Sequence, residues 1–376
     1  MKKSKIILFG NTDWYLFNFR LTLAEKLREE GHDLLLISPP GEYGERLAAL
    51  GYRWQALPMD RRSLNPLREF ALLAHLVRLF RTERPDLVRG FTIKAAVYGA
   101  VAGKFARVAG IVNSVNGLGF VFIGDQLKAR LLRPAVRLAM RYAFSGRNSR
   151  VIVQNPTDRD QFVAEKIIAS GNIRLIPGSG VDCAIFSPVT DDDDDDRPLR
   201  VLLPSRLLWD KGIGEFVEAS RILGRSDLRF QIAGEVDDGN PAAIDSDQAS
   251  AWQEEGVVEL LGHVDDMAGL VKSVDLVVLP SYREGLPKSL IEAAACGKAI
   301  VTTDVPGCRD VVEHGVSGLV VPVRDGKALA EAVATLADNR AIRQEMGQAA
   351  RRRALAEFDK DIIVRRTIEV YEEIRR

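Results

Sequence analysis

Residues 275–318 read DLVVLPSYREGLPKSLIEAAACGKAIVTTDVPGCRDVVEHGVSG, and this stretch decides the fold class. An apolar run at 275–279 leads into a turn, and a helix-length segment at 289–296 follows Pro287. A second apolar run then occupies 299–303. A strand, a helix and a strand in this order predict two parallel strands joined by a crossover helix, the unit of an α/β sheet.

The same alternation runs along the rest of the chain in two series. The segments between the apolar runs repeat their apolar residues at helical spacing, the pattern of helices that cover a sheet. The sequence therefore predicts an α/β protein with two Rossmann-like, doubly wound domains facing a central cleft. The expected strands lie at 5–9, 33–37, 52–57, 86–91, 111–115, 150–154 and 172–177, and then at 200–203, 228–233, 257–261, 275–279, 299–303 and 319–321.

Six consecutive aspartates at 191–196 mark the expected domain boundary. Like charges repel one another and do not pack, so a solvated linker is favoured over an acidic metal site. We predict an N-terminal domain at 1–187, an acidic linker at 188–198 and a second domain at 199–357. The tail at 358–376 is predicted to form a separate helix.

The composition is that of a folded protein with two different halves. Of the 376 residues, 46% are hydrophobic and 28% are charged, which excludes wholesale disorder. The formal net charge is zero, but residues 1–187 hold 28 basic and 16 acidic side chains, and residues 188–376 hold 24 and 36. This asymmetry indicates that the two halves have different partners.

Several classes of protein are disfavoured by what the sequence lacks. The three cysteines form no C-x-x-C pair and the four histidines are never spaced at i, i+4, which argues against a disulfide framework and a histidine metal site. No apolar run approaches the ~20 residues of a membrane-spanning helix. Neither domain begins with the Gly-x-Gly-x-x-Gly of dinucleotide-binding proteins, and no Gly-Lys-Ser/Thr phosphate loop occurs. We therefore expect a protein of a reducing cytosolic setting, without a cofactor.

The loop before the helix of the opening stretch is a candidate phosphate site. Backbone N–H groups near Gly285 and Leu286, at the positive end of the helix dipole, attract an anion, and Gly285 has no Cβ in the way. Glu284 in this loop and Glu292 inside the helix cannot both face a phosphate, so sugar hydroxyls are their expected partners. Ser289, where the helix is expected to start, is counted with this site. The alternative is an ordinary strand–helix unit with two surface glutamates.

A second loop supplies cations to the same edge of the sheet. The strand at 200–203 runs into PSRLLWDKG, which places Arg206 and Lys211 beyond its carboxyl end. In an acidic domain a diphosphate needs such local cations, and charge-assisted hydrogen bonds contribute roughly 1.5–3 kcal/mol each.

These residues carry a resemblance to a known family. Arg206 and Lys211, followed by the E-x7-E pair Glu284 and Glu292, resemble the retaining glycosyltransferases of family 4, which have the GT-B fold. The family's C-terminal segment crosses back onto its first domain, and the helical tail of this chain is similar to it. The likeness covers nearly the whole chain and includes the further motifs Gly234-Glu235, LGHV at 261–264, Pro306-Gly307 and EHGVSG at 313–318.

The resemblance implies a role for each residue of this site. Arg206 and Lys211 would bind the diphosphate of a UDP-sugar, and Glu284 would bind the donor hexose, so these three are the predicted catalytic residues. The other donor contacts that it implies are the amides of Gly285 and Leu286 on the β-phosphate, Glu292 on the ribose, the turn with His263 and Val264 on the uracil, and Gly234 and Ser289.

Retention of the anomeric configuration is also implied by the resemblance. No carboxylate is placed as an obvious covalent nucleophile, so we expect the acceptor hydroxyl to attack beside the departing diphosphate, which takes the proton. Metal dependence is the rival interpretation. Two D-x-D motifs occur, at Asp245 and Asp247 and at Asp359 and Asp361, but neither follows an apolar strand, so no metal is expected.

The N-terminal domain is predicted to bind the acceptor. Two of its strand-end loops contain Asn11, Asp13, Asn116 and Gly117, which are candidate contacts for acceptor hydroxyls. Asp13 has the alternative role of capping the helix that follows it. Many family members have a histidine where this chain has Asn116, so no general base is assigned there.

The same domain is predicted to meet an anionic membrane. An aliphatic and aromatic run at 120–123 precedes a helix with arginines at spacings of three and four. This combination favours shallow docking on lipid over the alternative of a core helix with a solvated basic face. The membrane candidates are Phe120, Phe122, Arg130, Arg133, Arg137 and Arg141.

The opening residues and the turn at 117–120 resemble enzymes that extend undecaprenyl-diphosphate sugars in bacterial glycan assembly, in particular the N,N'-diacetylbacillosaminyl-diphospho-undecaprenol α-1,3-N-acetylgalactosaminyltransferase group. The implied substrates are UDP-N-acetylgalactosamine and a polyprenyl-diphosphate-linked amino sugar, and no nucleic acid is expected as a partner. The implied location is the cytoplasmic face of the bacterial inner membrane, peripheral or monotopic and without a transmembrane helix.

Other functions stay open at this point. A transferase of the same fold could use another lipid or a soluble acceptor. A UDP-sugar epimerase of GT-B fold is disfavoured by the E-x7-E pair, and a non-enzymatic nucleotide-sugar-binding protein is disfavoured by the intact set of site residues.

Overall fold

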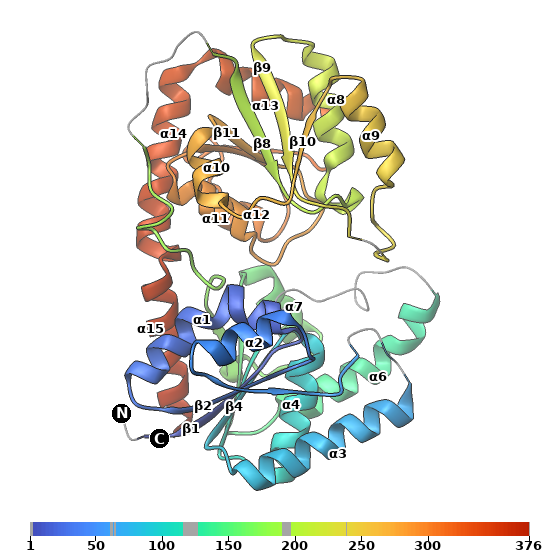
Figure 1. Ribbon diagram of the computed structural model, residues 1–376, viewed down its shortest axis with the longest axis vertical. Helices are drawn as coiled ribbons and strands as arrows, with labels where there is room; N and C mark the ends of the chain where they lie inside the picture. The colour runs from blue at the N-terminus through green and yellow to red at the C-terminus, as the bar shows by residue number, and fades with distance from the viewer. Residues whose placement is uncertain are drawn as a thin grey trace. The chain divides into compact units, whose positions relative to one another are not determined.

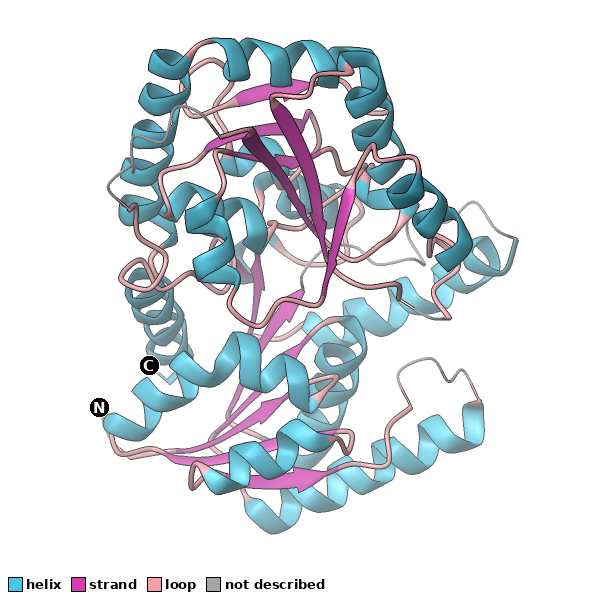
Figure 2. Cartoon of the chain, turned by 45° about the horizontal axis from the view of Figure 1, so that its top comes forward, coloured by secondary structure: helices cyan, strands magenta, loops and turns pink. Residues whose placement is uncertain are grey.

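The computed structural model describes residues 3–60, 63, 65–115, 127–189, 197–237 and 239–375, without the side chains of 127–132 and 375. The chain forms two units, Met1–Ser179 with Ile363–Arg376, and Gly180–Ile362. Each unit has one fully parallel sheet with helices on its faces (Figures 1 and 2). The predicted architecture of two Rossmann-like domains is confirmed.

The first unit is built on seven strands in the order β3-β2-β1-β4-β5-β6-β7. Its central strands are buried along almost their whole length, as expected for a sheet covered on both faces, and they bury the polar side chains of Arg89, Asn113 and Ser114 among the apolar ones. The strand order reverses between β1 and β4, which makes this the switch point of the sheet. The elements are β1 (Lys5–Phe9), α1 (Asp13–Glu29), β2 (Asp33–Ser38), α2 (Glu42–Ala49), β3 (Arg53–Ala56), α3 (Pro66–Glu83), β4 (Leu87–Phe91), α4 (Ile93–Ala106), β5 (Gly110–Val115), α6 (Leu127–Phe144), β6 (Ser149–Val153), α7 (Pro156–Ala164), η1 (Ser170–Asn172) and β7 (Ile173–Leu175).

The second unit has six strands in the order β10-β9-β8-β11-β12-β13, and its switch point lies between β8 and β11. The elements are β8 (Leu199–Pro204), η2 (Trp209–Lys211), α8 (Ile213–Leu223), β9 (Leu228–Ala233), α9 (Ser246–Glu254), β10 (Glu259–Gly262), α10 (Met267–Ser273), β11 (Leu276–Leu279), α11 (Lys288–Ala295), β12 (Ala299–Thr303), α12 (Cys308–Val311), β13 (Leu319–Val321), α13 (Gly326–Asp338), α14 (Arg340–Arg353), the π-helical turn η3 (Ala354–Phe358) and α15 (Lys360–Arg375).

The unit boundaries differ from those expected from the sequence. Residues 180–187 belong to the second unit, because Val181 pairs with Asp359 and Lys360 donates to Asp182. From Ile363 onward, inside α15, the chain belongs to the first unit again. Hydrogen bonding rather than the acidic run therefore sets the division.

Helix α15 completes the core of the first unit. Arg89 of β4 is buried and donates from NH1 to the Tyr371 hydroxyl at 2.7 Å. Glu373 accepts from Arg174 and, at 2.9 Å, from Arg150. The hydrogen bond from Arg174 holds the pKa of Glu373 below its ordinary value, so its carboxylate stays charged as an anchor for the helix.

Candidate active site

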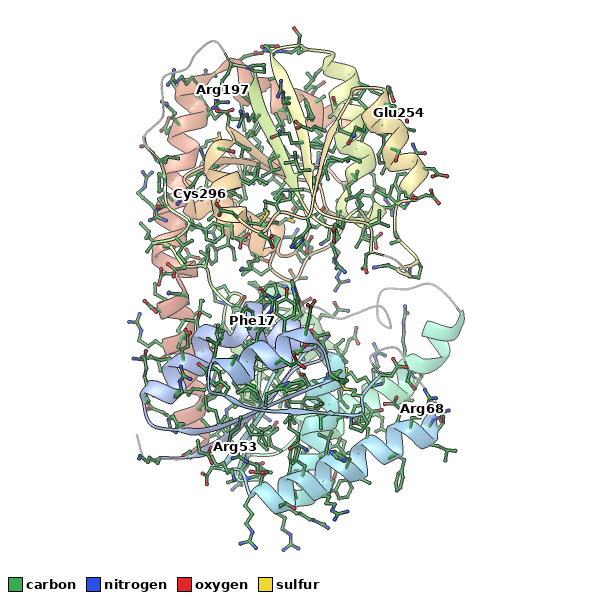
Figure 3. The ribbon with its side chains drawn as sticks, viewed as in Figure 1. Phe17, Arg53, Arg68, Arg197, Glu254 and Cys296 are labelled. Carbon is green, nitrogen blue, oxygen red and sulfur yellow. The ribbon has the colours of Figure 1, made fainter. Side chains whose placement is uncertain are left out.

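The switch point of the second sheet brings two loops together, one after β8 and one after β11. In open α/β sheets, ligands bind beyond the carboxyl ends of the strands at such a point. Arg206 and Lys211 follow β8, and Glu284 follows β11. In Figure 3 the labelled Arg197 precedes β8, at the opposite end of that strand, and Cys296 ends α11.

Two of the predicted catalytic residues are in direct contact. Lys211 Nζ lies 2.5 Å from Glu284 Oε1. The two side chains are 21% and 13% exposed, respectively, so a ligand can reach the pair although most of its surface is covered. Such a pair is screened by salt less than a surface ion pair, and its charges remain available for exchange with a ligand.

The backbone holds the two loops together. Gly212 has a φ of 73°, and a Cβ there would lie 2.1 Å from the carbonyl oxygen of Pro280. Only glycine allows this approach. The amide of Tyr282 also donates to the carbonyl of Asp210 at 2.9 Å. These contacts fix the ion pair at the junction of the two loops.

Helix α11 begins beside this ion pair. Its N-cap residue, Pro287, makes no side-chain capping hydrogen bond. On the other side, Gly307 packs so closely that a Cβ would lie 2.8 Å from the carbonyl oxygens of Glu284 and Gly285. A helix start without a side-chain cap, next to a lysine, is suited to an anionic group.

The helix begins one residue earlier than the sequence predicts. Lys288 is its first residue, so Ser289 lies in the first turn, where it is half-buried. Lys288 Nζ lies 2.9 Å from Glu292 Oε1, one turn further along. Glu292 is buried, and burial raises the pKa of its carboxyl group while Lys288 opposes the shift. The carboxylate thus lies within the helix next to a cation that a ligand could replace.

Arg206 makes its ion pair with a residue that the sequence did not single out. Its NH1 lies 2.6 Å from Asp237 Oδ2, in the loop after β9. The side chain of Arg206 is 61% exposed, in contrast to that of Lys211. Asp237 lies beyond the carboxyl end of β9, at the same edge of the sheet as Arg206 and Glu284. This position after a strand was the one signal in the sequence that could have identified Asp237 as a site residue.

The remaining donor candidates lie on the loops after β9 and β10. Gly234 has a φ of 154°, and a Cβ there would lie 2.0 Å from the Ser205 carbonyl oxygen. Its amide donates to the Gly262 carbonyl at 2.8 Å. His263 is exposed and lies 3.3 Å from an Asp265 oxygen. Val264 packs against the apolar core of this unit, as does Leu286 in the loop after β11.

In the first unit, Asp13 is held by backbone groups. Its Oδ1 accepts from the amide of Trp14 and its Oδ2 from the amide of Gly44, each at 2.9 Å. The cap of α1 is Thr12, whose hydroxyl accepts from Tyr15 at 3.0 Å. These two backbone amides are enough to stabilise the buried carboxylate of Asp13, so its burial does not require a substrate as partner.

Asn11 is the other described acceptor candidate. Its Oδ1 is buried and accepts no hydrogen bond from any described group. The predicted contacts Asn116 and Gly117, and the predicted membrane residues Phe120 and Phe122, lie outside the described residues. The same holds for the side chain of Arg130.

The three described arginines of α6 have different surroundings. Arg137 is paired with Glu165 at 2.5 Å, Arg133 is half-buried and Arg141 is exposed. Exposed apolar side chains accompany them on α6, namely Leu138 and Tyr142, which are 70% and 48% exposed.

A further exposed apolar pair lies near the start of α3. Leu67 and Phe70 are 81% and 73% exposed, one helical turn apart. In the sequence, Leu67 and Phe70 at i, i+3 beside Arg68 were the one signal of this pair, and nothing there showed that both side chains are exposed.

The D-x-D motifs have local structural roles. Asp245 caps α9 and accepts from the amide of Asp247 at 2.8 Å, and Asp359 accepts from the amide of Asp361 at 2.9 Å. Within the described ranges, three or more His, Cys, Asp or Glu side chains nowhere gather closely enough to hold a metal ion. Among the same residues, no helix combines the length and apolar character needed to cross a membrane.

Two family models match the chain: a glycosyl transferase 4-like model at residues 5–155 and a glycosyl transferases group 1 model at 198–339. The chain is 27% identical over 370 residues to the N,N'-diacetylbacillosaminyl-diphospho-undecaprenol alpha-1,3-N-acetylgalactosaminyltransferase of Campylobacter jejuni, which covers 96% of both proteins. It is 23% identical over 296 residues to the UDP-Gal:alpha-D-GlcNAc-diphosphoundecaprenol alpha-1,3-galactosyltransferase of Escherichia coli, covering 75% of this chain and 74% of that protein. Among solved structures, Anabaena Alr3699/HepE in complex with UDP matches with a TM-score of 0.79 and 21% identity over 98% of this chain and 99% of that one.

Two Rossmann-like units, one with a lysine–glutamate pair at the start of a helix, define a protein of the GT-B fold class, and the structural match confirms this prediction. The two family models together cover most of both units. The chain belongs to the family 4 glycosyltransferases, also called group 1 glycosyl transferases.

Proposed function

We propose that the protein is a retaining glycosyltransferase that moves a hexosamine, N-acetylgalactosamine, from UDP to a polyprenyl-diphosphate-linked sugar in bacterial glycan assembly. The observation that carries the proposal is the contact of Lys211 with Glu284 beside the start of α11. The likeness to the Campylobacter jejuni enzyme over nearly the whole chain supports the choice of donor and acceptor.

The donor is proposed to lie along the active edge of the second sheet. Its diphosphate would accept hydrogen bonds from the amides of Gly285 and Leu286, just before α11, and from the amides of the first turn of α11. Lys211 and Arg206 would donate to it as well. Glu284 would then exchange Lys211 for hydroxyls of the hexose. An anion bound to amides and lysine together gains charge-assisted hydrogen bonds that neither provides alone.

The nucleoside is proposed to occupy the neighbouring loops. Glu292 would exchange Lys288 for the ribose hydroxyls, since hydroxyl donors stabilise a buried carboxylate. The uracil would meet backbone groups near His263 and Val264. The close approach of Gly234 to the loop after β8 keeps these loops together without a side chain between them.

The chemical step is proposed to follow a front-face route. The acceptor oxygen forms a bond to the anomeric carbon on the side from which UDP leaves, and the bond from that carbon to the β-phosphate oxygen breaks. The hydroxyl proton passes to a phosphate oxygen, so UDP carries it away. Lys211 and Arg206 stabilise the charge that develops on the leaving oxygen, and loss of one such donor typically costs ~10²–10³ in turnover.

The first unit is proposed to bind the acceptor and the lipid surface. The side-chain oxygen of Asn11 accepts no hydrogen bond from any described group, and an acceptor hydroxyl would supply one once the side chain turns toward it. Exposed apolar side chains on α3 and α6, with Arg141 and Arg68, suit a surface of anionic lipid. We therefore propose a peripheral or monotopic protein at the cytoplasmic face of the bacterial inner membrane.

The test is UDP release from a panel of UDP-sugars, with and without a lipid extract that contains polyprenyl-diphosphate sugars. Release from UDP-N-acetylgalactosamine that requires the lipid supports the proposal, and it should persist in EDTA. Conversion of the sugar without UDP release would instead identify an epimerase. Binding without either reaction would identify a nucleotide-sugar-binding protein.

A further inference from the structure

The loops after β8 and β9 are joined by backbone hydrogen bonds. Leu207 donates to the carbonyl of Glu235 at 2.9 Å and accepts from the amide of Ile244 at 3.0 Å. Trp209 donates to the carbonyl of Ala242 at 2.8 Å. Arg206 and the loop that faces it are therefore held at a fixed separation by the fold itself.

Asp237 is positioned within this framework. Its Oδ2 accepts from Arg206 NH1 at 2.6 Å and from Asn240 Nδ2 at 2.9 Å. Its side chain is 25% exposed, compared with 61% for Arg206. The carboxylate is thus the more fixed partner of the ion pair, and the guanidinium is the more accessible one.

An acidic side chain at this point opposes the binding of a diphosphate. An exposed ion pair contributes only about 0–1 kcal/mol to stability, so stability alone is a weak reason for it. When Arg206 turns to a diphosphate, Asp237 gives up its ion pair with Arg206 and keeps the hydrogen bond from Asn240. Glu284 differs, because sugar hydroxyls can replace Lys211 as its partners.

We propose that Asp237 is the counter-anion of Arg206. When no diphosphate is bound, the Asp237 carboxylate holds the Arg206 guanidinium. When UDP is bound, the carboxylate competes with the diphosphate for this guanidinium, so that UDP is released faster. This inference rests on the proposed donor site. Release of the product limits turnover in many transferring enzymes, and a competing carboxylate lowers product affinity without touching the nucleoside. Asp237 acts through Arg206 and is therefore a positioning residue.

The first experiment measures UDP and uridine binding to Asp237→Asn by calorimetry. We expect UDP to bind roughly ten-fold more tightly, because the competing charge is gone, and uridine to bind as in the unchanged protein. A loss of folding cannot produce tighter binding. Asp227→Asn is the matched control, because Asp227 lies 2.6 Å from Arg225 at the opposite end of β9 and should leave both affinities unchanged.

A second pair of variants tests whether the effect passes through Arg206. In an Arg206→Ala background, Asp237→Asn should strengthen UDP binding by less than about half of the free energy that it contributes when Arg206 is present. Asp237→Glu, which keeps the charge, should retain the original UDP affinity. A gain that persists in full without Arg206 contradicts the counter-anion role.

The possible failures are distinguishable. If the unchanged protein binds UDP but Asp237→Asn binds it no more tightly, the inference is wrong and the donor site stands. If the unchanged protein binds neither UDP nor a UDP-sugar, the proposed function is wrong and the inference falls with it.

Discussion

Carboxylates at the edges of the two sheets are held in two different ways. At the edge of the second sheet, carboxylates are paired with side-chain cations, whereas Asp13 in the first unit is held by two backbone amides. A side chain can turn from its partner to a ligand, but a backbone amide cannot move away. A carboxylate paired with a side-chain cation is therefore suited to exchange its partner for a ligand, as we propose for the donor site, whereas one held by backbone amides is suited to a structural role. The exchangeable pairs are Lys211 with Glu284, Lys288 with Glu292, and Arg206 with Asp237.

Two buried cations of the first unit are held instead by aromatic side chains. Arg20 and Arg89 are both buried, and both lie over the ring of Phe91 at 4.6 and 4.8 Å. Arg20 donates to the Tyr15 hydroxyl and Arg89 to that of Tyr371. Burial lowers the pKa of Arg89, and Tyr371 opposes this shift. These cations tie α1, β4 and α15 together.

The largest expected effect is on the exchangeable pair at the start of α11. Lys211→Ala should lower turnover by ~10²–10³, because the charge on the departing diphosphate loses a donor, while the KM for the donor changes much less. Steady-state kinetics of UDP release measure both constants. Lys327→Ala, on the exposed side of α13, is the control and should keep full activity. Unchanged turnover in Lys211→Ala would remove this residue from the chemistry.

The next effect concerns the fixed charge of the first unit. Asp13→Ala should lower the free energy of unfolding by about 1–3 kcal/mol, since the buried amide of Gly44 and the part-buried amide of Trp14 lose their acceptor. UDP affinity should stay the same. Urea unfolding and calorimetry measure the two quantities, with the exposed Asp33→Ala as control. Full stability combined with a loss of acceptor binding would make Asp13 a substrate contact instead.

A moderate effect is expected on membrane binding by the first unit. Replacing Leu67 and Phe70 by serine should weaken binding to anionic vesicles roughly ten-fold, because exposed apolar surface can no longer enter the lipid. Vesicle sedimentation measures this, and Ile222→Ser in the second unit is the control.

Added salt should detach the protein from vesicles before it weakens UDP-sugar binding, since exposed charges are screened most. The reverse order would count against the membrane assignment.

The smallest effect is on the pH dependence of stability. Burial raises the pKa of Glu292 above its ordinary value of 4.5, so the folded protein holds this proton more tightly than the unfolded chain does. Stability from this group is therefore present at low pH and is lost as pH rises from the ordinary value to the raised one. Glu292→Gln should remove that decline, as urea unfolding across the acid range can measure. An unaltered pH profile in the variant would mean that Glu292 ionises in the folded protein as in the unfolded chain.

Most of the fold was predictable because buried parallel strands are continuous apolar runs. Every expected strand forms, and its ends shift by two residues or fewer. Helix α11 begins one residue before the expected start at 289, because Lys288 follows the N-cap residue Pro287 directly. The division between the units was harder to predict, because it depends on pairing between Val181 and Asp359, far apart in the sequence.

The site was predictable where topology alone brings residues together. Lys211 and Glu284 follow the two strands of the switch point, so their contact follows from strand order. The partner of Arg206 depends on the course of an irregular loop, which has no periodic pattern to read. The two roles considered for Asp13 could not be separated, because its second partner, Gly44, belongs to another helix.

The most direct measurement follows the sugar itself. UDP-N-acetylgalactosamine labelled in the sugar is incubated with the protein and a polyprenyl-diphosphate-linked acceptor, and the label is then divided between water and organic solvent. We expect the label to enter the lipid phase in an α-linkage, in step with UDP release, and Lys211→Ala to abolish most of this transfer. Label that remains in the nucleotide, or appears in water as free sugar, would contradict this expectation.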